Sequence, residues 1–129
     1  MTNSHLLHRE FDYIEPDSLD GALALLADYG GRAGLLAGGT YLLVQMKQEH
    51  ASPSVVVNIG NLPALAGASW SGDQLSIGGL TTIRETRDLA SVHTHYQALT
   101  EACAAFGSMQ IQMTGTLGGN VCNGSPASD

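Results

Sequence analysis

The chain has 129 residues, enough for one domain of ordinary size and too few for two. Hydrophobic residues make up 43% of it and charged residues 13%, a globular composition that argues against disorder. The net charge is −7, and nucleic acid binding is excluded because it needs clustered cations. The basic residues are instead scattered, at Arg9, Arg32, Lys47, Arg84 and Arg87.

The sequence shows no segment that would target the chain to a membrane. Its first residues mix charged and polar side chains with few apolar ones, unlike a signal peptide. The longest apolar stretches, Leu23–Ala27 and Leu35–Ala37, are far shorter than a membrane span. Cys103 and Cys122 alone cannot form a disulfide framework. We therefore expect a cytoplasmic protein without a membrane span.

The first half of the chain has the pattern of a small parallel α/β unit, in which strands alternate with helices. Ser18 is a suitable N-cap for a helix that ends at Gly30, and a second helix is predicted from Thr40 or Tyr41 to Lys47. The apolar face of the first helix is predicted to hold Leu19, Ala22, Leu23, Leu26 and Ala27. The predicted strands are Phe11–Ile14, Gly34–Ala37 and Val55–Asn58.

The second half combines a hairpin with helices. Thr82 and Glu85 have the spacing of a capping box, which predicts a helix over residues 83–89. A longer helix is predicted over His95–Phe106, and the alternation in Met109–Met113 predicts a further strand. The predicted hairpin pairs Ala66–Trp70 with Gln74–Ile77 around Gly72.

The strand predicted at Gly34–Ala37 is followed at once by Gly38, Gly39 and Thr40. Small residues let a ligand approach the main chain, where successive N–H groups form an anion-binding nest. The next helix adds the partial positive charge of its N-terminus, and Thr40 can donate its hydroxyl. The motif lacks the lysine of a P-loop and the third glycine of a dinucleotide fingerprint. It suits a phosphate group, with a plain tight turn as the alternative interpretation.

A second segment, Thr116–Asn120, repeats this chemistry around Gly118 and Gly119. Two such segments can hold a pyrophosphate from both sides, and an acidic chain must do so with backbone N–H groups rather than with cations. We therefore expect Gly38 and Gly118 to face one cleft. A side chain at Gly39 or Gly119 is expected to occupy the space of a phosphate oxygen.

These motifs, in this order and over essentially the whole chain, resemble the molybdopterin-dehydrogenase FAD-binding family. Its members include the medium subunit of carbon-monoxide dehydrogenase and the flavin domain of xanthine dehydrogenase. Two long motifs some eighty residues apart make the resemblance specific. The residues that carry it are Leu35-Leu36-Ala37-Gly38-Gly39-Thr40-Tyr41-Leu42, Lys47, Thr82 with Glu85, Thr116-Leu117-Gly118-Gly119-Asn120 and Ser125-Pro126-Ala127-Ser128-Asp129.

The resemblance implies an α+β, two-subdomain fold of the FAD-binding PCMH type. A small α/β subdomain is expected at residues 1–60, and an antiparallel-sheet subdomain at residues 61–129. The second subdomain is expected to be incomplete, because the chain ends on a polar, glycine-bearing segment and family members continue beyond it. FAD is expected between the two parts.

The same resemblance implies which residues bind FAD: the two glycine motifs, an aromatic residue and a carboxylate. Core packing is an equal alternative for Phe106, and terminal disorder is an alternative for Asp129. No catalytic residue and no metal ligand is expected, since His93 and His95 lack a third ligand and Cys103 suits a buried apolar role. The expected FAD-binding residues are Leu35, Leu36, Ala37, Gly38, Gly39, Thr40, Tyr41, Leu42, Phe106, Thr116, Leu117, Gly118, Gly119, Asn120 and Asp129.

Three residues depart from the family pattern. Tyr41 stands where the family often has Asp or Ser, and it adds bulk beside the first motif. Gln112 and Met113 replace a common Arg-Asn pair, which removes a positive charge expected near the phosphates.

The function implied by the resemblance is that of a flavoprotein subunit in a molybdenum hydroxylase. Electrons would pass from iron–sulfur clusters on a small partner subunit through FAD to an external acceptor, after substrate oxidation at the molybdenum cofactor of a large partner subunit. The alternative is a non-catalytic fragment that keeps the pyrophosphate motifs but does not bind flavin tightly.

Overall fold

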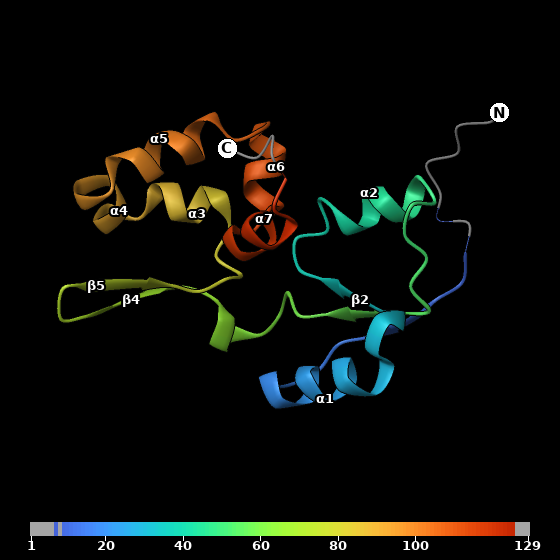
Figure 1. Ribbon diagram of the computed structural model, residues 1–129. Coiled ribbons are helices and arrows are strands. Elements are labelled where there is room, and N and C mark those ends of the chain that lie inside the picture. Colours follow the sequence, from blue (N-terminus) through green and yellow to red (C-terminus); the bar gives the residue numbers. More distant parts are fainter. Residues whose placement is uncertain (1–6, 8, 126–129) are drawn as a thin grey trace. The chain divides into compact units, whose positions relative to one another are not determined.

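The computed structural model describes Leu7 and residues 9–125 of the chain. The chain divides into two compact units, Met1–Leu62 and Pro63–Asp129, and each is considered by itself (Figure 1). No helix among the described residues is long and apolar enough to cross a membrane.

The first unit is built on a three-stranded parallel sheet in the order β1-β3-β2. The strands are β1 (Asp12–Ile14), β2 (Ala33–Leu36) and β3 (Val55–Asn58), which confirms the predicted parallel unit. Val55, Val56 and Val57 are at most 1% exposed. Because successive side chains of a strand point to opposite faces, this burial shows that both faces of β3 are covered.

The first helix, α1 (Leu19–Tyr29), begins and ends as predicted. The Ser18 hydroxyl accepts a hydrogen bond from the Gly21 N–H at 3.1 Å, and Gly30 ends the helix with a φ of 52°. A 3₁₀ turn, η1 (Gly30–Arg32), then leads into β2.

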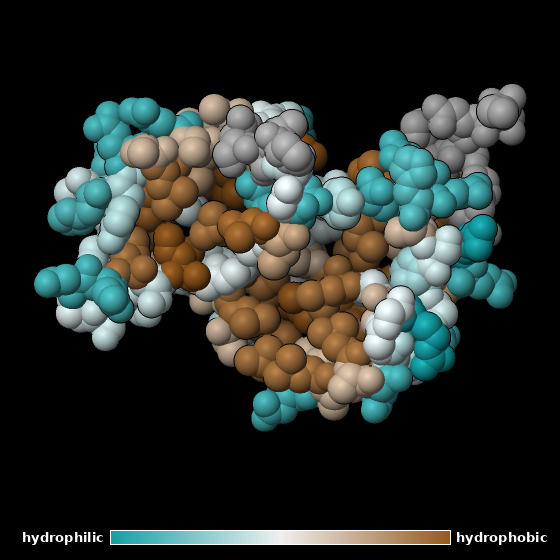
Figure 2. Space-filling view, viewed as in Figure 1, coloured by the Kyte–Doolittle hydropathy of each residue, from teal (hydrophilic) through white to brown (hydrophobic). Residues whose placement is uncertain are grey.

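The predicted apolar face of α1 is only partly correct. Ala22 is buried and packs toward the sheet, but Leu19 is 40% and Leu23 56% exposed, and Figure 2 shows apolar surface over this region. Leucine and alanine occupy so many positions of this helix that the apolar arc is wider than one face. Periodicity therefore predicted the helix but could not fix its rotation.

A hydrogen-bonded cluster joins the carboxyl ends of β1 and β3. The Tyr13 hydroxyl donates to Glu15 Oε1 at 2.5 Å, and Asn58 Nδ2 donates to both Tyr13 Oη (2.6 Å) and Glu15 Oε1 (2.9 Å). Asn58 Oδ1 accepts from the Gly60 N–H at 2.9 Å. The bond from Tyr13 lowers the pKa of Glu15, and the Glu15 carboxylate raises the pKa of Tyr13.

The second unit contains one antiparallel hairpin and five short helices among its described residues. After the 3₁₀ turn η2 (Pro63–Leu65), strands β4 (Ala68–Ser71) and β5 (Gln74–Ile77) pair around Gly72, as predicted. The helices are α3 (Ile83–Asp88), α4 (Ala90–His95), α5 (Gln97–Ala105), α6 (Met109–Thr114) and α7 (Leu117–Asn123).

The predicted strand at Met109–Met113 is wrong, because this segment forms α6. The helix starts at Ser108, whose hydroxyl accepts from the Ile111 N–H at 3.4 Å. The alternating apolar residues do not face the core: Met109 is 62% and Met113 60% exposed, whereas Gln112 is only 5% exposed. Alternation predicts a strand only where one face is buried, and here the buried side chain is the polar one.

The helix predicted over His95–Phe106 is interrupted. Tyr96 has non-helical angles (φ −132°, ψ 58°), so α4 ends before it and α5 begins after it. The capping box of α3 is confirmed: the Glu85 N–H donates to the Thr82 hydroxyl, and the Thr82 N–H donates to Glu85 Oε2 at 2.8 Å.

Helix α3 lies at the centre of the second unit, where it contacts α4, α5 and α6 (Figure 1). The core around it includes Ile83, Val92 and Cys103, each at most 3% exposed. Burial raises the pKa of the Cys103 thiol, which agrees with its predicted role as a small buried residue.

The start of α7 is fixed by backbone contacts to residues 79–83. Thr116 forms an antiparallel bridge with Thr82, and the Leu117 N–H donates to Thr81 O at 2.9 Å. The Gly118 N–H donates to Gly79 O at 2.8 Å. A Cβ atom at Gly118 would lie 2.8 Å from that oxygen and 3.0 Å from Gly79 Cα. Gly118 is therefore required for close packing of two backbone segments.

We expect Gly118→Ala to destabilise the protein by about 1–3 kcal/mol, because neither backbone segment can move away cheaply. The free energy of unfolding from urea denaturation measures the effect. Gly79→Ala is the matched control, since a Cβ there would meet only Gly118 Cα, at an ordinary 3.7 Å. Equal stability of the two variants would contradict this account.

The cluster at Glu15 predicts a pH dependence. Because the pKa of Glu15 is lowered in the folded state, its contribution to stability is present above the ordinary carboxyl pKa and is lost as the pH falls through the lowered value. Tyr13→Phe removes the hydrogen-bond donor that lowers the pKa of Glu15 most, so this acid-dependent part of the stability should shrink. Urea midpoints at about pH 7 and about pH 3 test it. Tyr29→Phe, outside the cluster, should leave the pH dependence unchanged.

Candidate functional site

The first glycine motif, Leu35–Leu42, runs from the end of β2 to the first residue of α2 (Leu42–Lys47). It therefore leaves the sheet at the carboxyl end of a parallel strand, where ligands of open α/β sheets commonly bind. The helix begins at Leu42 rather than at Thr40 or Tyr41 as the sequence predicted, so Tyr41 belongs to the connection.

Gly39 has a φ of 76°, in the region that favours glycine. A Cβ atom there would lie 3.0 Å from Leu43 Cδ1 and 3.4 Å from Leu36 Cδ1. Positive φ and close packing together explain why this position carries no side chain.

The carbonyl and N–H groups of this motif differ in their hydrogen bonding. Carbonyl groups bond into the chain: Gly39 O accepts from the Leu43 N–H at 3.3 Å, and Tyr41 O accepts from the Gln45 N–H at 3.0 Å. The N–H groups of Gly38, Gly39 and Thr40 have no hydrogen-bond acceptor within the described part of the chain. Neighbouring N–H groups without protein acceptors are what an anion-binding nest requires.

The side chains in and next to the motif are mostly apolar. Leu36, Leu42 and the adjacent Leu43 are half-buried, whereas Leu35 is 46% and Tyr41 54% exposed. The exposed Tyr41 makes no side-chain bond to the start of α2. Its bulk, noted in the sequence as a departure, therefore adds an aromatic surface beside the motif.

The second motif, Thr116–Asn120, is the beginning of α7 rather than a loop. The Thr116 hydroxyl accepts from the Gly119 N–H at 3.1 Å, and the Asn120 N–H donates to Thr116 O at 3.0 Å. With Leu117 and Gly118 bonded to Thr81 and Gly79, all four N–H groups of residues 117–120 have acceptors in the chain. The prediction that this motif repeats the open N–H chemistry of the first is wrong.

The expectation for Gly119 changes as well. A Cβ atom there would lie 2.8 Å from Thr116 Oγ1, the oxygen that caps α7. A substitution at Gly119 would therefore disturb the start of the helix, in addition to any effect on a ligand.

Phe106 directly follows α5, and its side chain is half-buried. Its carbonyl accepts a hydrogen bond from Gln112 Nε2 at 2.9 Å. The sequence flagged Gln112 only as a missing positive charge near the phosphates, but the structure shows a buried residue bonded within the second unit. The sequence signal for this role is weak: Gln112 is a polar residue between the apolar Ile111 and Met113. The segment that contains it was also predicted to be a strand.

The predicted FAD-binding roles stay predictions, and two of them concern positions that the structure does not place. Asp129 lies outside the described residues. Gly38 belongs to the first unit and Gly118 to the second, so their meeting at one cleft stays a prediction.

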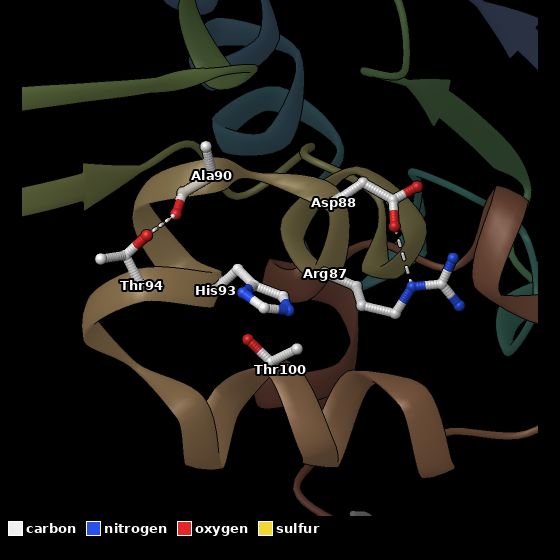
Figure 3. Close-up of a pocket in the computed structure, with 6 residues that line it drawn as sticks. All are labelled: Arg87, Asp88, Ala90, His93, Thr94 and Thr100. Atoms are coloured by element: carbon white, nitrogen blue, oxygen red, sulfur yellow. Dashed lines mark hydrogen bonds and ion pairs between the residues drawn. The ribbon is translucent and has the colours of Figure 1, made fainter.

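A separate pocket of about 580 Å³ lies in the second unit (Figure 3). Figure 3 shows the ring of His93 on α4 beside the side chain of Arg87 on α3, with Thr100 of α5 below the ring. The Arg87 guanidinium bonds to Asp88 at 2.9 Å, and Thr100 Oγ1 is buried without a partner among the described residues. None of the described residues that are expected to bind FAD lines it. The lining residues are Arg87, Asp88, Ala90, His93, Thr94 and Thr100.

Metal binding has no support in the described part of the chain, where no three His, Cys, Asp or Glu side chains gather around a common point. His93 and His95 are exposed, and His95 instead makes an edge contact with Trp70, with ring centroids 5.8 Å apart.

Residues 9–129 match the family model of the FAD binding domain in molybdopterin dehydrogenase. The carbon monoxide dehydrogenase medium chain of Hydrogenophaga pseudoflava is 34% identical over 119 residues, which cover 92% of this chain and 42% of that one. The xanthine dehydrogenase FAD-binding subunit of Escherichia coli O157:H7 is 36% identical over 118 residues, 91% of this chain and 40% of that one. The chain thus spans about two-fifths of the length of these relatives.

Solved structures agree with this. Carbon monoxide dehydrogenase from Hydrogenophaga pseudoflava, lacking the Mo-pyranopterin moiety, matches with a TM-score of 0.93 and 33% identity, over 96% of this chain and 43% of that one. Reconstituted CO dehydrogenase from Oligotropha carboxidovorans matches with a TM-score of 0.92 and 32% identity, over the same shares. The predicted α+β fold of FAD-binding type is confirmed. The chain belongs to the family of FAD-binding domains of molybdopterin dehydrogenases, whose cofactor is FAD.

Proposed function

We propose that this chain holds FAD in a molybdenum-dependent dehydrogenase, passing electrons from iron–sulfur clusters through FAD to an external acceptor. The proposal is supported by family membership and by relatives named as the medium chain or FAD-binding subunit of such enzymes. Its proposed partners are a large subunit with the molybdenum cofactor and a small subunit with the iron–sulfur clusters. Bound FAD supplies the redox chemistry, while the chain supplies binding and orientation.

The observation that carries the proposal is the row of N–H groups at Gly38, Gly39 and Thr40. Because they have no acceptors among the described residues, they can donate to the pyrophosphate oxygens of FAD, and the positive φ of Gly39 shapes the backbone that carries them. The chain has a net charge of −7, and none of its basic residues lies within this motif. Backbone donors are therefore the available means of binding phosphate here.

The remaining residues of the proposed site contribute in other ways. We assign Leu35–Leu42 to one side of the FAD site and Thr116–Asn120 to the other, as the family resemblance implies. Since the N–H groups of Leu117, Gly118 and Gly119 are already bonded, the second motif would contribute mainly a surface without side chains that a ligand can approach closely. Phe106 would contribute an aromatic contact, and Asp129 a carboxylate acceptor for hydroxyl groups. The two FAD-binding subdomains are proposed at residues 1–60 and 61–129.

A second candidate is a domain that keeps the fold but binds flavin weakly. One observation favours it: the backbone donors of residues 117–120 all have acceptors within the chain, so this part of the chain does not need a ligand to fold. Micromolar affinity requires about 8 kcal/mol after binding costs, and the first motif alone offers few hydrogen bonds of about 0.5–1.5 kcal/mol each. FAD titration of the 129-residue chain distinguishes the two candidates.

Gly39→Ala should weaken FAD binding by about tenfold or more, because a side chain at positive φ strains the motif and redirects its N–H groups. The dissociation constant from flavin fluorescence, together with the urea midpoint, is the measurement. Gly31→Ala is the control, since a Cβ at Gly31 meets nothing within 4 Å.

A companion variant separates strain from ligand contact. Gly39→Asn tolerates positive φ better than alanine and should recover most of the stability, while its side chain still obstructs the ligand. Unchanged FAD affinity in both Gly39 variants would show that the motif is only a turn.

The proposed electron route is tested in the assembled dehydrogenase. Adding the organic substrate should bleach the flavin absorbance of the wild-type complex. A complex that carries Gly39→Ala and has lost FAD should still reduce its iron–sulfur clusters but should fail to reduce the external acceptor. Acceptor reduction at the wild-type rate without flavin would reject the route while leaving FAD binding intact.

A further inference from the structure

Gln112 on α6 is a buried polar residue with every group of its amide in use. It is 5% exposed. Its Oε1 accepts from Arg87 Nη1 at 3.1 Å, and its Nε2 donates to Phe106 O at 2.9 Å and Ala104 O at 3.3 Å. One side chain thus connects α3, the end of α5 and α6. Buried polar networks in which every member is satisfied favour one arrangement of the backbone.

The chemistry of these contacts calls for an amide. Carbonyl groups in the last turn of a helix have no helical partner, and Gln112 provides donors for two of them at the end of α5. Arg87 donates to Asp88 through Nε, and the amide oxygen of Gln112 provides an acceptor for its Nη1 group. A carboxylate of the same size would face the two carbonyl oxygens without donors, and an apolar side chain would leave three polar groups unsatisfied.

Arg87 is itself held in place. Its Nε donates to Asp88 Oδ1 at 2.9 Å, and Asp88 accepts from Arg84 Nε at 2.5 Å through its other oxygen. The hydrogen bonds from these two arginines, the bond from Arg87 most of all, lower the pKa of Asp88. The bonded series Arg84–Asp88–Arg87–Gln112 therefore ends on the backbone of Phe106.

We infer that Gln112 is the positioning residue for Phe106: it fixes the backbone from which this aromatic side chain reaches the flavin. The inference rests on the proposed function, in which Phe106 contacts FAD. Phe106 needs such support because the chain turns directly after it, at Gly107 with a φ of 50°. A shift of the α5–α6 connection would move the ring, whereas the bonds from Gln112 hold it.

The test compares two glutamines of the same helix in the FAD-loaded protein. Gln112→Glu keeps the size and the acceptor for Arg87 but removes both donors, and it should raise the dissociation constant of FAD about tenfold. Gln110→Glu makes the same change on an exposed residue and should alter the dissociation constant less than about twofold. Gln112→Met, which keeps the volume without adding charge, serves if Gln112→Glu fails to fold.

A double-mutant cycle with Phe106→Leu separates positioning from general stability. If Gln112 acts through Phe106, Gln112→Glu should weaken FAD binding only while the aromatic ring is present and add nothing in the Phe106→Leu background. Additive losses in the two backgrounds would overturn the inference, as would an unchanged dissociation constant of Gln112→Glu or Gln112→Met. Loss of FAD binding in Gly39→Ala with no effect of Phe106→Leu would overturn the inference and leave the proposed function standing. No FAD binding by the wild type would instead overturn the function.

Discussion

A backbone N–H group can donate either to the protein or to a ligand, and this constraint separates the two glycine motifs. In the first motif the N–H groups of Gly38, Gly39 and Thr40 have no acceptor in the described part of the chain, while carbonyl groups bond into α2. In the second, Thr116, Gly79 and Thr81 accept the donors of residues 117–119. Similar sequences therefore have different physical roles: one presents donors, and the other builds the start of a helix.

The difference separates a glycine that close backbone packing requires from one that we propose for the ligand site. Gly118 lies so close to Gly79 that a methyl group on Gly118 would clash with the carbonyl oxygen of Gly79. Gly39 is confined by a positive φ and by two leucine side chains, and its neighbours' N–H groups have no acceptor among the described residues. In this acidic chain we propose that such peptide dipoles, rather than lysine or arginine, balance the phosphate charge of the ligand.

Polar groups also organise the interior of the second unit. Its helices have six to nine residues, too short for stability without tertiary contacts. The core around Ile83, Val92 and Cys103 is supplemented by the buried amide of Gln112, which satisfies the end of α5. This arrangement makes the α5–α6 connection, and with it Phe106, depend on a few directed bonds.

The sequence by itself determined the parallel α/β unit, the capping boundaries of α1 and α3, the hairpin and the family, because these depend on local patterns: β-branched runs, Ser18 and Thr82 as N-caps, glycine turns and two long motifs. It could not determine the rotation of α1, because the leucines and alanines of this helix fill more than one face. Nor could it determine that Met109–Met113 is helical, because the exposed methionines give the alternating apolar pattern of a strand. It also could not show that the N–H groups of residues 117–120 donate to acceptors within the chain. Which acceptor an N–H group meets, and which side of a short segment is buried, depend on residues distant in sequence, such as Gly79 and Arg87, and only the tertiary structure brings these together.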